Sequence, residues 1–188
     1  LSVVNALSEW LEVEVYQNGH IYKQIYNRGV PQRALAIVGD IDRTGTRVTF
    51  YPDDEIFETV VFNYDNLKVR LRQLAYLNKG LTISIKDDRE EKPRFDEFCY
   101  EGGILHFVED LNKNKEVLFA QPVYFEEMQD DNSIEVAIQY NDSYSETIFS
   151  YANNIHTEEG GTHLDGFKAA LTKVINDAGR RLNILKEN

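Results

Sequence analysis

The stretch LEVEVYQNGHIYKQIY, residues 11–26, is the part of the sequence that decides the fold. In its first half a leucine and two valines at odd positions alternate with two glutamates and a tyrosine. This two-residue period is typical of a strand with one buried face. Asn18 and Gly19 follow, and because both residue types tolerate a positive φ, the pair predicts a tight hairpin turn. Residues 21–26 supply the returning strand, so we expect a β-hairpin here.

The residues on either side of this hairpin indicate further short elements. Upstream, residues 1–8 have the pattern of a helix end, with Trp10 expected in the core where that helix meets the first strand. Downstream, Gly29 and Pro31 close the hairpin. Further strands are expected at residues 34–38, 46–51, 81–86, 117–125, 134–140 and 146–152.

Helices are predicted from the 3.6-residue period. The clearest in the first half spans residues 65–78, with a stripe of leucines at 67, 71, 74 and 77, Asp65 as a suitable N-cap and Gly80 as its end. The remaining predicted elements are a charged loop at 87–94, a short helix at 104–112 and a long helix at about 164–182. Strands mixed with helices predict an α/β fold in two layered units.

Composition limits the function classes. The chain has 188 residues, 42% of them hydrophobic, which is enough for a core, and a net charge of −12, which disfavours a broad DNA-binding face. The single Cys99 cannot form an internal disulfide, so a reducing compartment is expected. No apolar run approaches the ~20 residues of a membrane span. The chain starts within a helical pattern and without Met, so we expect an internal piece of a longer protein.

Two segments carry candidate chemistry. In Thr44-Gly45-Thr46, glycine permits close approach of a ligand to the backbone and two hydroxyls can bind a ring edge, although a plain turn has the same composition. Residues 153–163 place two histidines, two carboxylates and paired glycines before a helix. This segment fits either an anion-binding loop or a structural loop in which Thr162 caps the helix. Its histidines lack a third ligand at a usual zinc spacing.

Several motifs, taken in order, resemble the ATPase region of the B subunits of DNA gyrase and topoisomerase IV. They are LSVVNALS (1–8), TGT with a following valine (44–48), YEGGI (100–104), YNDSY (140–144), NNI (153–155) and GGTH (160–163). The last is highly specific to type II topoisomerases. RLRQLAYLNKG (70–80) resembles gyrase more closely than topoisomerase IV.

The resemblance implies a fold and a task. Residues 1–101 would form the back part of a Bergerat-type ATP-binding domain, shared with Hsp90, MutL and histidine kinases, and residues 102–188 the first part of a transducer domain. The parent protein would be an ATP-dependent type IIA topoisomerase using ATP and Mg²⁺.

The resemblance also implies partners and a location. The partners would be the A subunit of gyrase, DNA and a second B subunit, with ATP-site inhibitors as further ligands. The parent protein would act in the bacterial cytoplasm, or in an organelle of bacterial descent. The alternatives are a fragment of the topoisomerase IV B subunit and a non-catalytic interaction module.

The same resemblance assigns few site residues to this chain. Thr46 matches a threonine that helps to read the adenine edge, Val48 an apolar residue of that pocket, and Leu1 a further wall residue. Gln17 falls where many members have an arginine that packs on aminocoumarin inhibitors, so sensitivity to these drugs is in doubt. The family's general base, magnesium ligand and lid lie upstream of Leu1, and its transducer lysine lies downstream of Asn188. We therefore expect no catalytic residue, no metal ligand and no ATP hydrolysis in the isolated chain.

Overall fold

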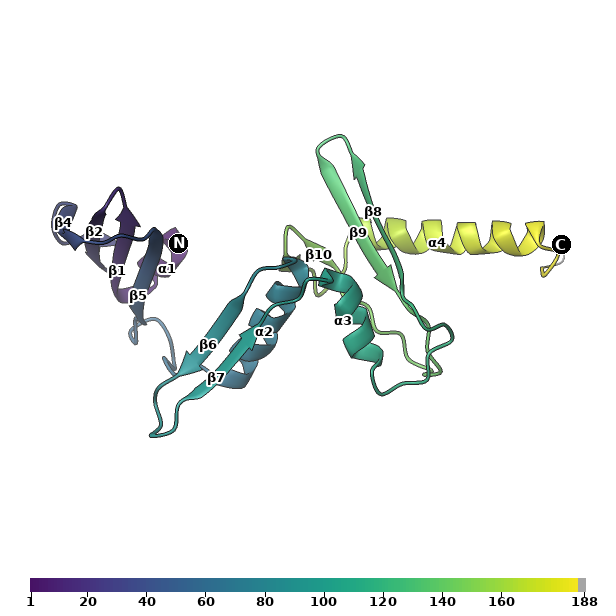
Figure 1. Cartoon of the computed structure of the whole chain (residues 1–188), viewed down its shortest axis with the longest axis horizontal. Helices are drawn as coiled ribbons and strands as arrows, with labels where there is room; N and C mark the ends of the chain where they lie inside the picture. The colour runs from purple at the N-terminus through teal and green to yellow at the C-terminus, as the bar shows by residue number, and fades with distance from the viewer. Residues whose placement is uncertain (186–188) are drawn as a thin grey trace. The chain divides into compact units, whose positions relative to one another are not determined.

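The chain divides into two compact units (Figure 1). A computed structural model describes residues 1–185, and its first unit is Leu1–Asn63, while the second begins at Tyr64. Helices and strands are mixed, as the sequence predicted. The domain boundary predicted between residues 101 and 102 lies inside the second unit and stays a prediction. Within residues 1–185, no helix has the length and apolar character needed to cross a membrane.

The first unit is one antiparallel sheet preceded by a short helix. Its strands run in the order β3-β2-β1-β5, and β4 also pairs with β2. The elements are α1 (Ser2–Ala6), β1 (Ser8–Gln17), β2 (His20–Asn27), β3 (Val30–Pro31), β4 (Ala36–Asp40) and β5 (Gly45–Pro52). Asn18 and Gly19 have φ of 54° and 79°, the left-handed values that a two-residue hairpin turn requires. The hairpin predicted from residues 11–26 is therefore confirmed.

A buried carboxylate organises one end of this sheet. Asp53 is 1% exposed and follows β5 directly. It accepts hydrogen bonds from the Arg28 guanidinium at 2.6 and 3.2 Å and from the Glu55 backbone amide at 3.0 Å. These bonds lower the pKa of Asp53, the Arg28 contact having the largest effect. Trp10, expected in the core, is instead 38% exposed, and Leu11 is buried in its place because alternate strand residues point to opposite faces.

Over residues 64–185 the second unit joins three hairpins to three helices. The elements are α2 (Tyr64–Leu77), β6 (Ile83–Asp87), β7 (Arg94–Phe98), α3 (Gly103–Asn112), β8 (Val123–Gln129), β9 (Asn132–Ile138), β10 (Tyr151–Ala152), β11 (Ile155–His156) and α4 (Thr162–Arg181). β6 pairs with β7, β8 with β9, and β10 with β11, all antiparallel. The two strands β8 and β9 form a long hairpin, drawn in green in Figure 1.

Aromatic residues form the core of the second unit. Tyr76 of α2 is 2% exposed, and its ring stacks on Tyr100 at 3.6 Å and on Phe107 at 4.9 Å between centroids. The leucine stripe is not the most buried side of α2, because Leu67 is 39% exposed while Tyr76 and Ala75 are buried. Two aromatic partners from outside the helix decide which face is covered, and the helical period alone does not contain that information.

Several element boundaries differ from the prediction. The strand expected at 117–125 begins at Val123, and Val117 makes only an isolated bridge to Asn141. The strand expected at 146–152 is reduced to Tyr151–Ala152. β7, at Arg94–Phe98, was not predicted, and the charged loop expected at 87–94 included its first residue. Strand propensity depends on pairing and packing as well as on residue type, and each of these strands extends only as far as its hairpin partner does.

Both helix caps predicted from residue type are wrong. α2 begins at Tyr64, so Asp65 lies within its first turn, and its carboxylate binds the Arg94 guanidinium at 2.5 Å. α4 begins at Thr162, which places Gly161 at the N-cap with no side-chain capping bond. Gly161 has a φ of 144°, a conformation that suits glycine, and this moves the helix start one residue upstream.

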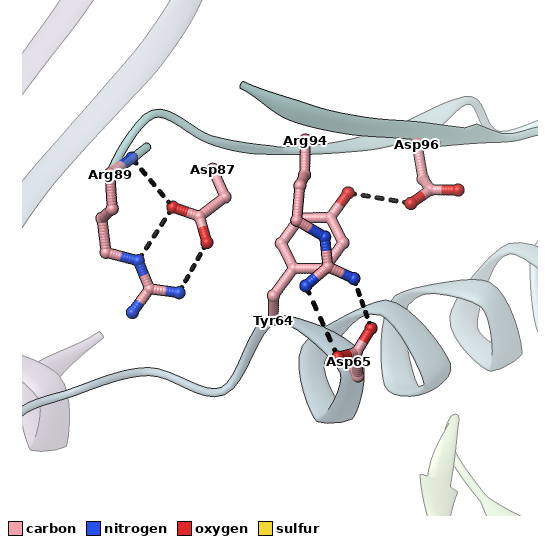
Figure 2. A network of polar contacts seen from close by, with 6 residues as sticks. All are labelled: Tyr64, Asp65, Asp87, Arg89, Arg94 and Asp96. Atoms are coloured by element: carbon pink, nitrogen blue, oxygen red, sulfur yellow. Dashed lines mark hydrogen bonds and ion pairs between the residues drawn. The ribbon is translucent and has the colours of Figure 1, made fainter. Parts of the chain in front are cut away.

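The start of α2 is held to the β6–β7 hairpin by polar contacts (Figure 2). The Arg94 guanidinium lies over the Tyr64 ring at 4.0 Å while it pairs with Asp65. The Tyr64 hydroxyl donates to Asp96 at 2.8 Å, and Lys68 lies 2.7 Å from the same carboxylate. Together these contacts lower the pKa of Asp96, Lys68 having the largest effect. They fix the orientation of α2 on the hairpin.

Asp87 at the end of β6 is expected to titrate far below an ordinary aspartate. The Arg89 guanidinium and backbone amide donate to this carboxylate at 2.5–3.1 Å, which lowers the pKa of Asp87 from 3.8 to about 2. Because the folded-state pKa is depressed, the pair stabilises the fold above about pH 4 and loses that effect as the pH falls toward 2. An NMR titration of the Asp87 carboxyl carbon measures the midpoint. Arg89→Ala should raise it, whereas Lys92→Ala in the same loop should not.

Candidate functional site

Thr46 and Val48, the two predicted pocket residues of β5, lie on one face of the first sheet. In the β1–β5 register Thr46 is opposite Val15, and Val48 is opposite Val13. Residues directly opposite each other in an antiparallel pair share a face, so all four side chains lie together. Val48 is 37% exposed and Thr46 is also exposed. The fold therefore presents a hydroxyl beside an apolar strip, which is suited to the edge and the face of a flat ring.

The start of β5 also borders a shallow depression of ≈ 330 Å³. It is open to solvent and is lined by Tyr16, Arg43, Thr44, Gly45, Thr46 and Arg47. The Arg43 guanidinium lies 5.2 Å from the centre of the Tyr16 ring. Ligand pockets normally enclose most of their ligand, and this depression does not. The described residues thus provide one rim of a site, lined by two arginines, two threonines, a tyrosine and a glycine.

A chain of charges on the opposite face of the sheet holds Tyr16 in place. The Tyr16 hydroxyl donates to Glu14 at 2.9 Å, and Lys23 lies 2.6 Å from Glu12 and 3.4 Å from Glu14. The Tyr16 bond is the main cause of a lowered pKa for Glu14. The pKa of Lys23 is raised, chiefly by its contact with Glu12. These contacts keep the Tyr16 ring at the depression that Thr46 borders.

The other predicted site residues lie apart from this strip. Leu1 precedes α1, outside the sheet, and is 69% exposed. Gln17 is the last residue of β1 and is opposite His20 across the hairpin turn. The β-sheet register thus brings Thr46 and Val48 together but does not include Leu1. Tyr16, Arg43 and Arg47 were not singled out from the sequence, although the β1–β5 pairing places Tyr16 opposite Gly45.

Residues 153–163 comprise the β10–β11 turn, β11, the connection to α4 and the first two residues of that helix. Asn153 and Asn154 both have positive φ at the β10–β11 turn. The Thr157 hydroxyl donates to the Ser150 carbonyl at 3.0 Å and lies 3.3 Å from the His163 ring. These bonds link Thr157 to the residues on either side of it in the chain. Among residues 1–185, no three His, Cys, Asp or Glu side chains gather in a way that could hold a metal ion.

The sequence and the structure of this chain are both similar to those of known proteins. Residues 103–188 match the family described as DNA gyrase B. The whole chain is 56% identical to the DNA gyrase B subunit of Clostridium acetobutylicum and 54% identical to that of Staphylococcus epidermidis, and spans 29% of each relative's length. A crystal structure of the 43K ATPase domain of Thermus thermophilus gyrase B, in complex with an aminocoumarin, superposes on the entire chain with a TM-score of 0.82 and 36% identity, over 51% of that structure. The B-subunit of Myxococcus xanthus gyrase gives a TM-score of 0.82 at 26% identity, over 93% of this chain and 51% of that one.

The fold is thus the mixed α/β fold of gyrase-type ATPase domains, of which this chain is one part. The chain belongs to the DNA gyrase B family. The identity extends through the first unit, which carries Thr46 and Val48, as well as through the second. The gyrase assignment made from the sequence motifs is therefore confirmed, and it is favoured over topoisomerase IV.

Proposed function

We propose that this chain is part of the ATPase subunit of DNA gyrase, an ATP-dependent type IIA topoisomerase that couples ATP binding and hydrolysis to strand passage and negative supercoiling. The observation that carries the proposal is identity of 54–56% to gyrase B subunits over the full chain. Residues 1–101 would belong to the ATP-binding domain and residues 102–188 to the transducer domain. The parent protein would bind the A subunit of gyrase, DNA and a second B subunit, in the bacterial cytoplasm.

Within this function the first sheet supplies one wall of the nucleotide pocket. Thr46 would hydrogen-bond the adenine edge through its hydroxyl, Val48 would contact the ring, and Leu1 would line the pocket after the lid. The exposed hydroxyl beside an apolar strip fits a purine, so the residues present suit this role. ATP supplies the phosphoryl chemistry when it is bound with Mg²⁺. The present residues would orient the base and would not transfer the phosphoryl group.

Nucleotide binding is expected only when the preceding segment of the parent protein is present. Calorimetric titration of the isolated chain with a non-hydrolysable ATP analogue and Mg²⁺ should give no heat of binding, because the shallow depression cannot enclose the phosphates. A longer protein that includes the preceding segment should bind one analogue per chain. If that longer protein does not bind, the alternative of a non-catalytic interaction module is favoured. One-to-one binding by the isolated chain would contradict the expected inactivity.

The role of Thr46 can be tested in that longer protein. Thr46→Val keeps the shape of the side chain but removes the hydroxyl, and the loss of one hydrogen bond should weaken analogue binding about tenfold. Thr49→Val on the same strand is the matched control, since Thr49 lies opposite Glu12 on the other face of the sheet. Equal affinities for the two variants would contradict the assignment.

Supercoiling of relaxed DNA by the complex with the gyrase A subunit separates gyrase from topoisomerase IV.

Aminocoumarin binding is reported for the Thermus thermophilus ATPase domain. In this chain Gln17 lies at the end of β1, where the resemblance expects an arginine. A glutamine lacks the charge and the planar stacking surface of a guanidinium. We therefore propose that the parent protein binds aminocoumarins less tightly than its Gln17→Arg variant.

A further inference from the structure

Lys79, just after α2, connects two parts of the second unit that are far apart in sequence. Its ammonium lies 2.7 Å from the Glu135 carboxylate, donates to the Tyr124 hydroxyl at 2.6 Å and lies 4.8 Å from the centre of the Tyr124 ring. Glu126 is a further 3.9 Å neighbour. We call these four residues the Lys79 cluster. Its three other members lie on the β8–β9 hairpin, so one lysine contacts both strands of that hairpin.

The path of the Lys79 side chain depends on a glycine at the start of α3. Gly103 has a φ of 57°, and a Cβ there would lie 2.6 Å from Cε and 2.7 Å from Cγ of Lys79. Any larger residue would have to displace the lysine stem. Gly103 is buried, so the stem passes over the backbone at this point before it reaches Tyr124. The Lys79 contact is therefore built from three separate segments of the unit.

The β8–β9 hairpin has a second attachment at its base. Asn112, which is 8% exposed at the end of α3, donates to Gln139 at 2.9 Å and accepts from Asn141 at 2.7 Å. Gln139 in turn donates to the Phe119 carbonyl at 3.0 Å. A hairpin held only at its base can pivot there. A second contact on the strands themselves removes that freedom and sets the angle of the hairpin.

We propose that Lys79 is a positioning residue that fixes the orientation of the β8–β9 hairpin relative to α2, so that the two move together. The functional part of this inference rests on the proposed function, in which α2 belongs to the ATP-binding domain and the hairpin to the transducer. Lys79 would then transmit movement between the two domains. Because the Lys79 side chain is 41% exposed and the Glu135 side chain 27%, the ion pair alone is modest, and the tyrosine contact adds to it.

Distance measurement between two spin labels tests the orientation directly. One label is attached to Cys99, the only cysteine, which is exposed and reports the part of the unit next to α2 and α3. The other is attached to a cysteine introduced by Met128→Cys; Met128 is 68% exposed and reports the hairpin. In this labelled background Lys79→Met keeps an apolar stem but removes the charge. It should raise the population of displaced hairpin orientations about fivefold to tenfold. Lys79→Arg, which keeps the charge and the ring contact, should give the same distance distribution as the chain with Lys79.

The control is Lys86→Met, the same change at a lysine of β6 that pairs with Asp88 at 2.7 Å. Superimposable distributions for Lys79→Met and the unsubstituted chain would overturn the proposal. In the longer protein assembled with DNA and the gyrase A subunit, Lys79→Met should reduce the supercoils introduced per ATP about twofold to fivefold at unchanged nucleotide affinity. An unchanged ratio would overturn the coupling role. Failure of the longer protein to bind nucleotide would instead refute the proposed function, and the spin-label distances would still decide the hairpin contact.

Discussion

Tyr76→Ala is expected to reduce the free energy of unfolding of the second unit by about 3–5 kcal/mol, the usual cost of deleting a buried aromatic ring. The Tyr76 ring is 2% exposed and stacks between Tyr100 and Phe107, so its loss leaves a cavity between α2 and α3. Its hydroxyl also contacts Asp110, which Arg72 binds at 2.7 Å. Urea denaturation followed by circular dichroism measures the change.

Tyr76→Phe separates the ring from the hydroxyl. It keeps both stacking partners and removes the hydroxyl contacts with Asp110 and Arg72, so the expected loss is about 1–3 kcal/mol. Asp110 still has the Arg72 guanidinium as a partner, which limits the loss. Tyr144→Ala is the matched control, because Tyr144 is fully exposed and its deletion should change stability by less than about 0.5 kcal/mol. Equal effects at Tyr76 and Tyr144 would refute the packing role.

Asp53→Ala is expected to lower the melting temperature of the first unit by roughly 5–10 °C. The change removes the carboxylate that Arg28 and the Glu55 amide bind, and it does so at a buried position. Arg28 has a φ of 45° in the turn after β2, so that turn loses its buried partner and keeps the exposed Glu55 carboxylate at 2.7 Å. The fluorescence of Trp10, the only tryptophan, follows this unit.

The pH dependence of that melting temperature gives a second test. Because the folded-state pKa of Asp53 is depressed, its contribution is present above about pH 4 and is lost as the pH falls through the lowered pKa. The stability difference between the unsubstituted chain and Asp53→Ala should therefore shrink at acid pH. Asp54→Ala, one residue further and exposed, is the control. A difference that does not change with pH would show that the Arg28 pair contributes little.

Family membership was readable from the sequence because it rests on short motifs, while the candidate site was readable only in part. Thr46 and Val48 were picked by resemblance, and their shared face follows from strand alternation once the β1–β5 register is known. Tyr16 and Arg43 at the same depression carry no motif of their own. Their position depends on which strands pair, and that is a long-range property of the fold.

The sequence by itself determined the local elements of this protein. Alternation and Asn18-Gly19 specify the β1–β2 hairpin, and the helical period with Gly80 specifies α2, because dihedral preferences act within a few residues. Only the tertiary structure decided that Tyr76 is buried, that Trp10 is exposed and that Lys79 reaches Glu135. Burial and ion pairing depend on partners tens of residues away in the sequence. Local dihedral preferences form a helix or strand without deciding which of its faces is buried, and the free energy of the long-range contacts makes that choice.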